Sequence, residues 1–149
     1  MSPYLSVVVC VYNEQENIRP MLAQIDAALA GMDYEIVYVD DGSRDGTLSE
    51  LKNSGNPRLR ILEFRRNYGQ SAALAAGIAA ARGEWIATLD GDLQNDPADI
   101  PLMLQIAGRD ELDMLAGVRQ KRQDGMFLRK IPSRIANWMI RQASGVHLH

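Results

Sequence analysis

Five short apolar runs, most of them followed at once by polar residues, recur along this chain. They span residues 5–11, 35–39, 60–64, 85–89 and 114–117. The first run is β-branched and almost continuously apolar, which is typical of a strand buried on both faces of a parallel sheet. We therefore predict that these runs form the strands of one sheet.

The segments between the runs have the spacing of helices. Apolar residues recur at helical intervals from Ile18 to Leu29, and Gly31 follows as a C-terminal stop. Ser71 is expected to cap an alanine-rich helix that ends before Gly83. The expected helices span residues 18–29, 47–53, 71–82, 97–107 and 127–143. Alternating strands and helices predict one α/β domain with a mostly parallel sheet.

The composition narrows the classes of function. The chain has 149 residues, 46% of them hydrophobic, and a formal net charge of −3. It has no basic tract interleaved with aromatic residues, so we expect no binding to nucleic acid. Its single cysteine, Cys10, cannot form an intrachain disulfide, which fits a reducing, cytosolic setting. We expect neither a secretory signal nor a membrane-spanning segment.

Polar clusters follow four of the expected strands. These clusters are residues 12–14, 40–41, 65–67 and 90–92. Parallel strands bring their carboxyl ends to the same edge of a sheet, and ligands of open α/β sheets bind at that edge. We therefore expect the four clusters to lie together and to form the functional site.

Asp90 and Asp92 flank Gly91 directly after the fourth apolar run. If Gly91 lets the backbone bend, both carboxylates can face one point, and Mg²⁺ favours a few carboxylate oxygens together with substrate phosphates. A polar turn after a strand is the alternative. Counted from Asp90, the glycine and glutamate positions of an EF-hand loop hold Asn95 and Pro101, and neither GxxxxGK[ST] nor GxGxxG occurs. The spacing favours a metal that binds a diphosphate.

Asp40 and Asp41 allow two interpretations. Either carboxylate could accept hydrogen bonds from the N–H edge of a base or from ribose hydroxyls. Alternatively, residues 40–43 form a capping turn before the next helix. The sequence pattern leaves both open.

The ordered motifs resemble those of family 2 glycosyltransferases with the GT-A fold. The matching segments are residues 11–14, 39–47, 66–69 and 90–94. Within this family the chain is most similar to dolichol-phosphate mannose synthase and the bacterial polyprenyl-phosphate sugar transferases. The resemblance covers nearly the whole chain and implies a Rossmann-like, three-layer α/β fold with helices on both faces of the sheet.

The resemblance also implies roles for individual residues. Asp90, Asp92 and Gln94 would hold Mg²⁺ or Mn²⁺ on the diphosphate of a nucleotide sugar, so Asp92 would take part in catalysis. The residues expected around the nucleotide sugar are Cys10, Tyr12, Glu14, Val39, Asp40, Asp41, Asp90, Gly91 and Gln94. Catalytic domains of this family usually continue beyond such a length. We therefore expect residues 1–149 to be the nucleotide-sugar-binding part of a longer catalytic domain.

The C-terminal part is basic, although the chain overall is acidic. Its cationic residues are Arg119, Lys121, Arg122, Arg129, Lys130, Arg134 and Arg141. By the resemblance, Arg119 and Arg129 fall where ligands of an acceptor phosphate sit, and the planar fork of arginine suits phosphate. The helix expected at 127–143 has a basic and an apolar face. It lies either on a membrane surface or with its apolar face on the sheet.

These observations predict a metal-dependent, inverting glycosyltransferase at the cytoplasmic face of a membrane. It would move a sugar from a UDP- or GDP-linked donor to a polyprenyl or dolichyl phosphate. Such a phosphate is mostly dianionic at neutral pH, because its second pKa is about 6, and can attack the anomeric carbon directly. Two alternatives stay open. One is a family 2 enzyme acting on a saccharide or protein hydroxyl, which needs a general base, and the other is a non-catalytic nucleotide-sugar-binding fragment.

Overall fold

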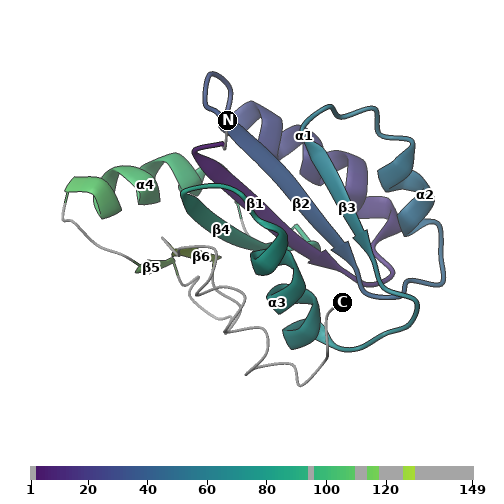
Figure 1. Cartoon of the computed structure of the whole chain (residues 1–149). Helices are drawn as coiled ribbons and strands as arrows, with labels where there is room; N and C mark the ends of the chain where they lie inside the picture. The colour runs from purple at the N-terminus through teal and green to yellow at the C-terminus, as the bar shows by residue number, and fades with distance from the viewer. Residues whose placement is uncertain (1–2, 94–95, 110–113, 118–125, 130–149) are drawn as a thin grey trace.

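The structure is a computed structural model that describes residues 3–93, 96–109, 114–117 and 126–129 (Figure 1). In this part of the chain six strands form one sheet in the order β3-β2-β1-β4-β6-β5. Four of them are parallel: β1 (Leu5–Val11), β2 (Tyr34–Asp40), β3 (Leu59–Glu63) and β4 (Trp85–Asp90). The short strands β5 (Met114–Gly117) and β6 (Met126–Arg129) extend the sheet beyond β4.

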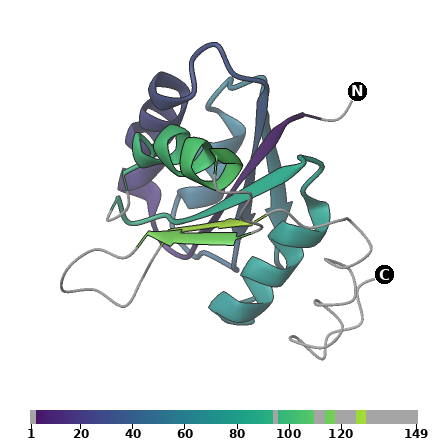
Figure 2. The same cartoon turned by 90° about the vertical axis from the view of Figure 1, so that its left-hand side faces the viewer.

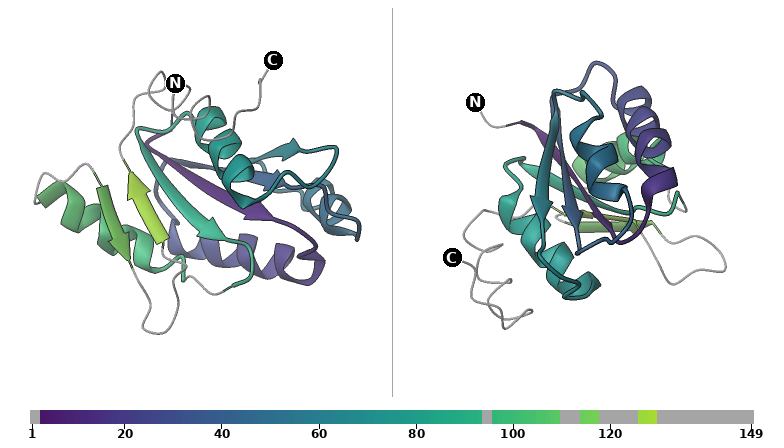
Figure 3. Two further views of the ribbon diagram at one scale, coloured as in Figure 1. Left: turned by 90° about the horizontal axis from the view of Figure 1, so that it is seen from below. Right: turned by 90° about the vertical axis from the view of Figure 1, so that its right-hand side faces the viewer.

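Helices cover both faces of the sheet, as Figures 2 and 3 show. On one face lie α1 (Ile18–Ala28), α2 (Thr47–Lys52) and α4 (Asp99–Arg109), and α3 (Gln70–Ala80) lies on the other. A 3-10 turn, η1 (Gln15–Asn17), precedes α1. The predicted three-layer α/β architecture is therefore confirmed.

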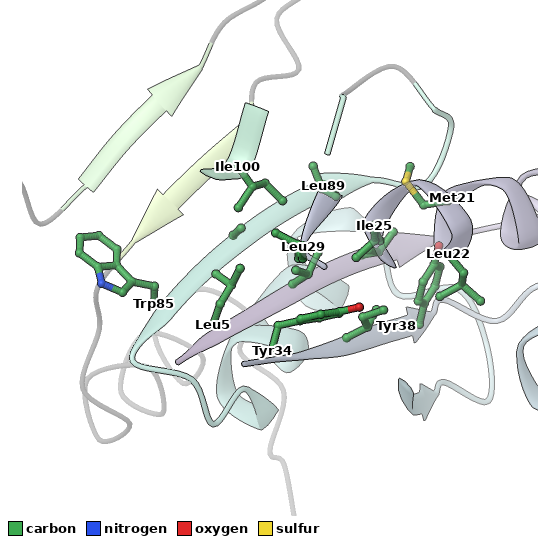
Figure 4. Close-up of a cluster of buried hydrophobic side chains, with 14 of the residues drawn as sticks. Leu5, Met21, Leu22, Ile25, Leu29, Tyr34, Tyr38, Trp85, Leu89 and Ile100 are labelled. Atoms are coloured by element: carbon green, nitrogen blue, oxygen red, sulfur yellow. The ribbon is translucent and has the colours of Figure 1, made fainter. Parts of the chain in front are cut away.

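The larger part of the core fills the space between the sheet and α1 (Figure 4). The apolar residues that recur at helical spacing in α1 are the ones that are buried, including Met21, Ile25 and Leu29. They pack with side chains such as Leu5 and Tyr38 from alternate positions of the strands. Strand alternation places the intervening residues on the opposite face.

On that opposite face α3 lies close to the sheet at Gly77. Gly77 lies directly over β1 and β2, and a Cβ at this position would overlap Val8 Cγ1 and lie 3.1 Å from Val39 Cγ2. The small residues of α3 permit this approach, and Ile78 packs with Val8. As a result, the alanine-rich sequence fixes the height of α3 above the sheet.

A polar network ties the end of α3 to the amino ends of three strands. The Glu35 carboxylate accepts hydrogen bonds from the Ser6 hydroxyl and the Arg82 amide, and it forms an ion pair with Arg60 at 2.8 Å. The Ser6 hydroxyl in turn accepts from the Gly83 amide at 2.7 Å. Burial raises the pKa of Glu35, but these hydrogen bonds and the charge of Arg60 outweigh it, so the pKa lies below its usual value.

The C-terminal end of the sheet differs from the prediction. Residues Met126–Arg129 form β6 instead of beginning the helix expected at 127–143, and the remainder of that helix lies outside the described residues. Strand β6 pairs antiparallel with both β4 and β5, so β5 is not adjacent to β4. Apolar spacing over so few residues does not separate strand from helix, and the deciding contacts are with Ile86–Thr88, far away in the sequence.

Candidate functional site

A cavity of about 330 Å³ opens at the carboxyl edge of the parallel strands. Its walls come from the end of β1, the residue after β2, the segment around the start of α3, and the end of β4. The lining residues are Cys10, Val11, Tyr12, Glu14, Asp41, Asn67, Gly69, Gln70, Ala73, Asp90, Gly91 and Asp92. Residues from all four predicted polar clusters therefore meet in one cavity.

Strand register explains which carboxylates reach this cavity. Cys10 pairs with Asp90 in the neighbouring strand, and Cys10 packs on the α3 face of the sheet. Asp40 instead pairs with Val11, which belongs to the core on the α1 face. Because paired residues of adjacent strands share a face, Asp90 lies on the α3 face with Cys10 and Asp40 lies on the α1 face with Val11. Asp90 lines the cavity and Asp40 does not.

Gly91 allows the two acidic residues of the β4 turn to line one cavity. A Cβ on residue 91 would overlap Val11 Cγ1 and lie 3.2 Å from the carbonyl oxygen of Cys10. Any larger residue would push the turn away from β1. The backbone at Gly91 thus passes close to β1. Asp90, which precedes Gly91, and Asp92, which follows it, both line the cavity.

The turn after β1 is locked to the turn after β2. Asn13 adopts a left-handed conformation with φ of 54°, its amide donates to Ser43 Oγ at 2.8 Å, and its Oδ1 accepts from the Arg44 amide at 2.8 Å. The Glu14 amide donates to Thr47 Oγ1 at 2.9 Å. These side chains replace regular strand pairing and hold the backbone on either side of Asn13, at Tyr12 and Glu14, in place.

Asp41 holds the segment that leads into α3. Its buried carboxylate accepts hydrogen bonds from the amides of Tyr68 at 2.8 Å and Gly69 at 3.1 Å. Gly42, with φ of +73°, lies so close to the backbone of residues 66–67 that a side chain there would overlap it. Asp41 therefore positions the loop before α3 as well as lining the cavity.

Two of the residues predicted around the nucleotide lie behind the cavity wall. Asp40 is 2% exposed, and its carboxylate accepts a hydrogen bond from the Ser43 amide at 3.1 Å, within the turn that follows β2. Val39 is fully buried beneath α3, against Gly77. Neither lines the cavity.

Cys10 is a protonated thiol at neutral pH. Its partial burial, together with the charges of Asp90 and Asp41, raises its pKa to about 12. A thiol of this kind is a poor nucleophile, because the thiolate is the reactive form. In the cavity Cys10 contributes a small, neutral surface between two carboxylates.

The donor set of the β4 turn fits a hard divalent cation. Asp90 and Asp92 supply carboxylate oxygens to the same cavity, and Mg²⁺ in proteins is typically bound by one or two carboxylates plus substrate phosphates. Within the described residues, no group of three or more His, Cys, Asp or Glu side chains could hold a metal. The turn thus offers part of a coordination shell and leaves room for ligand oxygens. Gln94, the third predicted metal ligand, lies outside the described residues.

The structure describes one of the two arginines that were predicted to bind the acceptor phosphate. Arg119 lies outside the described residues. Arg129 ends β6, and its backbone is in register with Ile86, near the amino end of β4, whereas Asp90 ends that strand at the cavity. The structure therefore does not bring Arg129 to the cavity edge of β4.

Sequence reasoning missed the contribution of the first turn of α3. Gln70 and Ala73 line the cavity, and Gln70 Nε2 donates a hydrogen bond to Asp90 Oδ1 at 3.0 Å. The helix begins at Gln70 after Gly69, which has φ of 103°, and not at the predicted cap Ser71. The loop expected at 65–70 follows a strand and contains Gln70, but nothing local indicates that Gln70 reaches β4.

Two tyrosines stand exposed at this end of the molecule. Tyr12, on the cavity wall, is 42% exposed. Tyr68, which directly precedes the cavity-lining Gly69 in the sequence, is 46% exposed. The Tyr68 ring contacts Phe64 edge-on, with centroids 5.5 Å apart, and the Arg66 guanidinium lies 4.8 Å from its centroid. Exposed aromatic faces beside a polar cavity suit the stacking of a planar ring.

No helix in the described part of the chain has the length and apolar content that a membrane crossing requires.

Comparison with known proteins gives matches over nearly the whole chain. A family model described as glycosyl transferase family 2 matches residues 6–148. A dodecaprenyl-phosphate galacturonate synthase from Rhizobium johnstonii is 49% identical over 150 residues, covering 97% of this chain and 44% of the relative. An undecaprenyl-phosphate 4-deoxy-4-formamido-L-arabinose transferase from Yersinia enterocolitica is 42% identical over 146 residues, covering 95% and 44%. The chain thus spans less than half the length of these relatives.

Solved structures share the fold at low sequence identity. A mannosyltransferase from Pyrobaculum calidifontis, in complex with GDP-Man and Mn²⁺, aligns with a TM-score of 0.73 and 22% identity over 87% of this chain and 45% of its own. A glucosyl-3-phosphoglycerate synthase from Mycobacterium tuberculosis, in complex with UDP, aligns with a TM-score of 0.70 and 20% identity over 86% and 57%. These matches establish the common fold.

Proposed function

Because this chain belongs to glycosyl transferase family 2, we propose that it forms the donor-binding part of an enzyme that transfers a sugar from a nucleotide sugar to a polyprenyl phosphate. The observation that carries the proposal is the cavity at the carboxyl edge of the sheet. It joins an exposed aromatic ring at Tyr12, a buried acid at Asp41 and the paired acids of the β4 turn.

The two ends of the cavity suit the two ends of a nucleotide diphosphate. On the β1 and β2 side, Tyr12 offers a ring face, and Glu14 and Asp41 offer acceptors for base or ribose N–H and O–H groups. Cys10 lies between this side and Asp90. Val39 and Asp40 support the wall from behind.

On the β4 side, Asp90 and Asp92, with Gln94 following, would hold Mg²⁺ or Mn²⁺ against the diphosphate. When bound, the metal stabilises the negative charge that develops on the departing nucleoside diphosphate. Gly91 keeps both carboxylates on the cavity wall, and Asp41 keeps the opposite wall in place through Tyr68 and Gly69. A reaction at a site arranged in this way needs no nucleophilic side chain.

The reaction would be a direct displacement at the anomeric carbon. An oxygen of the acceptor phosphate forms the new C–O bond while the bond to the nucleoside diphosphate breaks, so the anomeric configuration inverts. The acceptor is already mostly dianionic at neutral pH, and no general base is required. Arg119 is proposed to hold this phosphate, and we propose that the reaction takes place at the cytoplasmic face of a membrane.

The relatives support the acceptor class. The Rhizobium and Yersinia proteins are both named for transfer to a polyprenyl phosphate, of dodecaprenyl and undecaprenyl type respectively. Among the structural neighbours, one holds GDP-Man with Mn²⁺ and another holds UDP. Both nucleotides therefore belong in the test.

Calorimetry can test the donor site on this chain as it stands. UDP-sugars and GDP-sugars are titrated with and without Mn²⁺ into the wild type, Asp92→Ala and the control Asp33→Asn, an exposed acid outside the cavity. We expect Mn²⁺-dependent binding of one nucleotide class, its loss in Asp92→Ala and no change in Asp33→Asn. Equal affinity under all conditions would contradict the proposal.

The acceptor is tested with the full-length parent protein. Incubation with a nucleotide sugar and a polyprenyl phosphate should give a lipid-linked sugar, and Arg119→Ala should raise the KM for the lipid phosphate. Transfer only to water-soluble hydroxyl acceptors would favour the other branch of the family. Donor binding without any transfer would point to a binding module.

A further inference from the structure

Gln70 connects two parts of the cavity wall. It is the first residue of α3, it is exposed to the cavity, and its side-chain amide donates to Asp90 Oδ1 at 3.0 Å. The donor comes from a helix on one face, and the acceptor comes from the last position of β4. This hydrogen bond therefore joins the start of α3 to the end of β4.

The backbone of Gln70 is held from both directions. Before it, the Gly69 amide donates to Asp41 Oδ2 at 3.1 Å, and the Gly69 carbonyl accepts from Ala73 in the first turn of α3. Beyond it, Gly77 fixes α3 on Val8 and Val39. A glutamine side chain that starts from such a fixed point has few ways to reach Asp90, so its hydrogen bond restricts the orientation of that carboxylate.

We infer that Gln70 is a positioning residue for Asp90, which it orients for binding a divalent cation. The inference rests on the metal role of Asp90 in the proposed function. Outer hydrogen bonds commonly fix the orientation of metal-binding carboxylates, and their loss typically lowers metal affinity by 10–100-fold. The positioning acts through Asp90, because Gln70 donates its amide to the carboxylate.

The chemical type of the donor matters. A lysine or arginine in this place would partly cancel the charge that attracts the cation. The neutral amide of Gln70 orients the carboxylate and adds no positive charge beside Asp90 and Asp92.

Metal binding alone can test this positioning. Free Mn²⁺ is measured by electron paramagnetic resonance during titration of the wild type, Gln70→Leu and the control Gln24→Leu. The control removes the same amide from an exposed position of α1 outside the cavity. We expect Gln70→Leu to weaken Mn²⁺ binding by roughly tenfold, and Gln24→Leu to bind as the wild type does. Thermal unfolding should show both variants folded, with melting temperatures close to that of the wild type.

A double-mutant comparison separates positioning from a general effect on the cavity. If Gln70 acts through Asp90, Gln70→Leu should add little to the loss caused by Asp90→Ala. Wild-type Mn²⁺ affinity in a folded Gln70→Leu protein would overturn the inference while leaving the proposed function standing. Unchanged Mn²⁺ binding in Asp92→Ala would overturn both.

Discussion

At the scale of single residues, Gly91 sets the geometry of the acidic turn. A methyl group there would overlap Val11 Cγ1, so Gly91→Ala must displace either the turn or β1. We expect a loss of about 1–3 kcal/mol in unfolding free energy and weaker Mn²⁺ binding, measured by urea unfolding and metal titration. Adding Val11→Ala, which removes the methyl group that would overlap, should restore part of the unfolding free energy and part of the Mn²⁺ affinity. Unaltered metal binding in Gly91→Ala would show that the turn has more room than its contacts indicate.

Cys10 gives a second prediction at this scale, since its burial and two neighbouring carboxylates raise its pKa to about 12. The folded thiol should therefore react with iodoacetamide at pH 8 more than about a hundredfold more slowly than an ordinary cysteine. Unfolding in urea should restore the normal rate. The raised pKa also means that stability is fully present below the unfolded value of about 8.5 and decreases as the pH rises towards the folded value. Rapid labelling of the folded protein at pH 8 would contradict this environment.

At the scale of elements, Glu35 joins the end of α3 to strands β1, β2 and β3. Its carboxylate accepts from Ser6, Arg82 and Arg60 while only 7% of the residue is exposed. Glu35→Gln leaves Arg60 without its anion, and we expect a loss of about 2–4 kcal/mol in unfolding free energy at pH 7. Urea unfolding measures this difference directly.

The pH dependence of this loss follows from the pKa of Glu35, which lies below its usual value. A lowered folded-state pKa contributes stability above the unfolded value of about 4.3, and this contribution is lost as the pH falls through the folded pKa. The difference in unfolding free energy between wild type and Glu35→Gln should therefore be largest near neutral pH and become smaller below about pH 4. A gap that is independent of pH would mean that packing, and not charge, dominates. Arg19→Gln, which removes an exposed ion pair with Glu50, should change stability little at any pH.

At the scale of the whole molecule, ligand binding should stabilise the fold, because the cavity walls come from four separate parts of the chain. A nucleotide and Mn²⁺ at about 100 times their dissociation constant would add about 2.7 kcal/mol to the unfolding free energy. Thermal unfolding with UDP or GDP, each with and without Mn²⁺, should show the shift for one nucleotide. In Asp92→Asn the part of the shift that depends on Mn²⁺ should disappear. Equal shifts in the variant would argue against a metal at the β4 turn.

The sequence predicted the elements whose evidence is local. The apolar run at Leu5–Val11 and the helical spacing after Ile18 are visible within a few residues, and the acidic turns mark strand ends. Parallel topology then brings those turns together. The strand at Met126–Arg129 and the contact of Gln70 with Asp90 could not be predicted in this way, because each depends on a partner far along the chain. The face on which Asp40 lies likewise depends on its register with Val11.

The position of β1 inside the sheet has a consequence for synthesis on the ribosome. Strand β1 pairs with β2 on one side and with β4 on the other, yet β4 begins only at Trp85. A nascent chain that has released β1, β2 and β3 can pair these strands while the other edge of β1 is still open. That edge belongs to a strand whose residues are almost all apolar, and open apolar edges favour intermolecular pairing. The emergence of β4 is therefore the step that ends the exposure of the nascent chain to aggregation along β1.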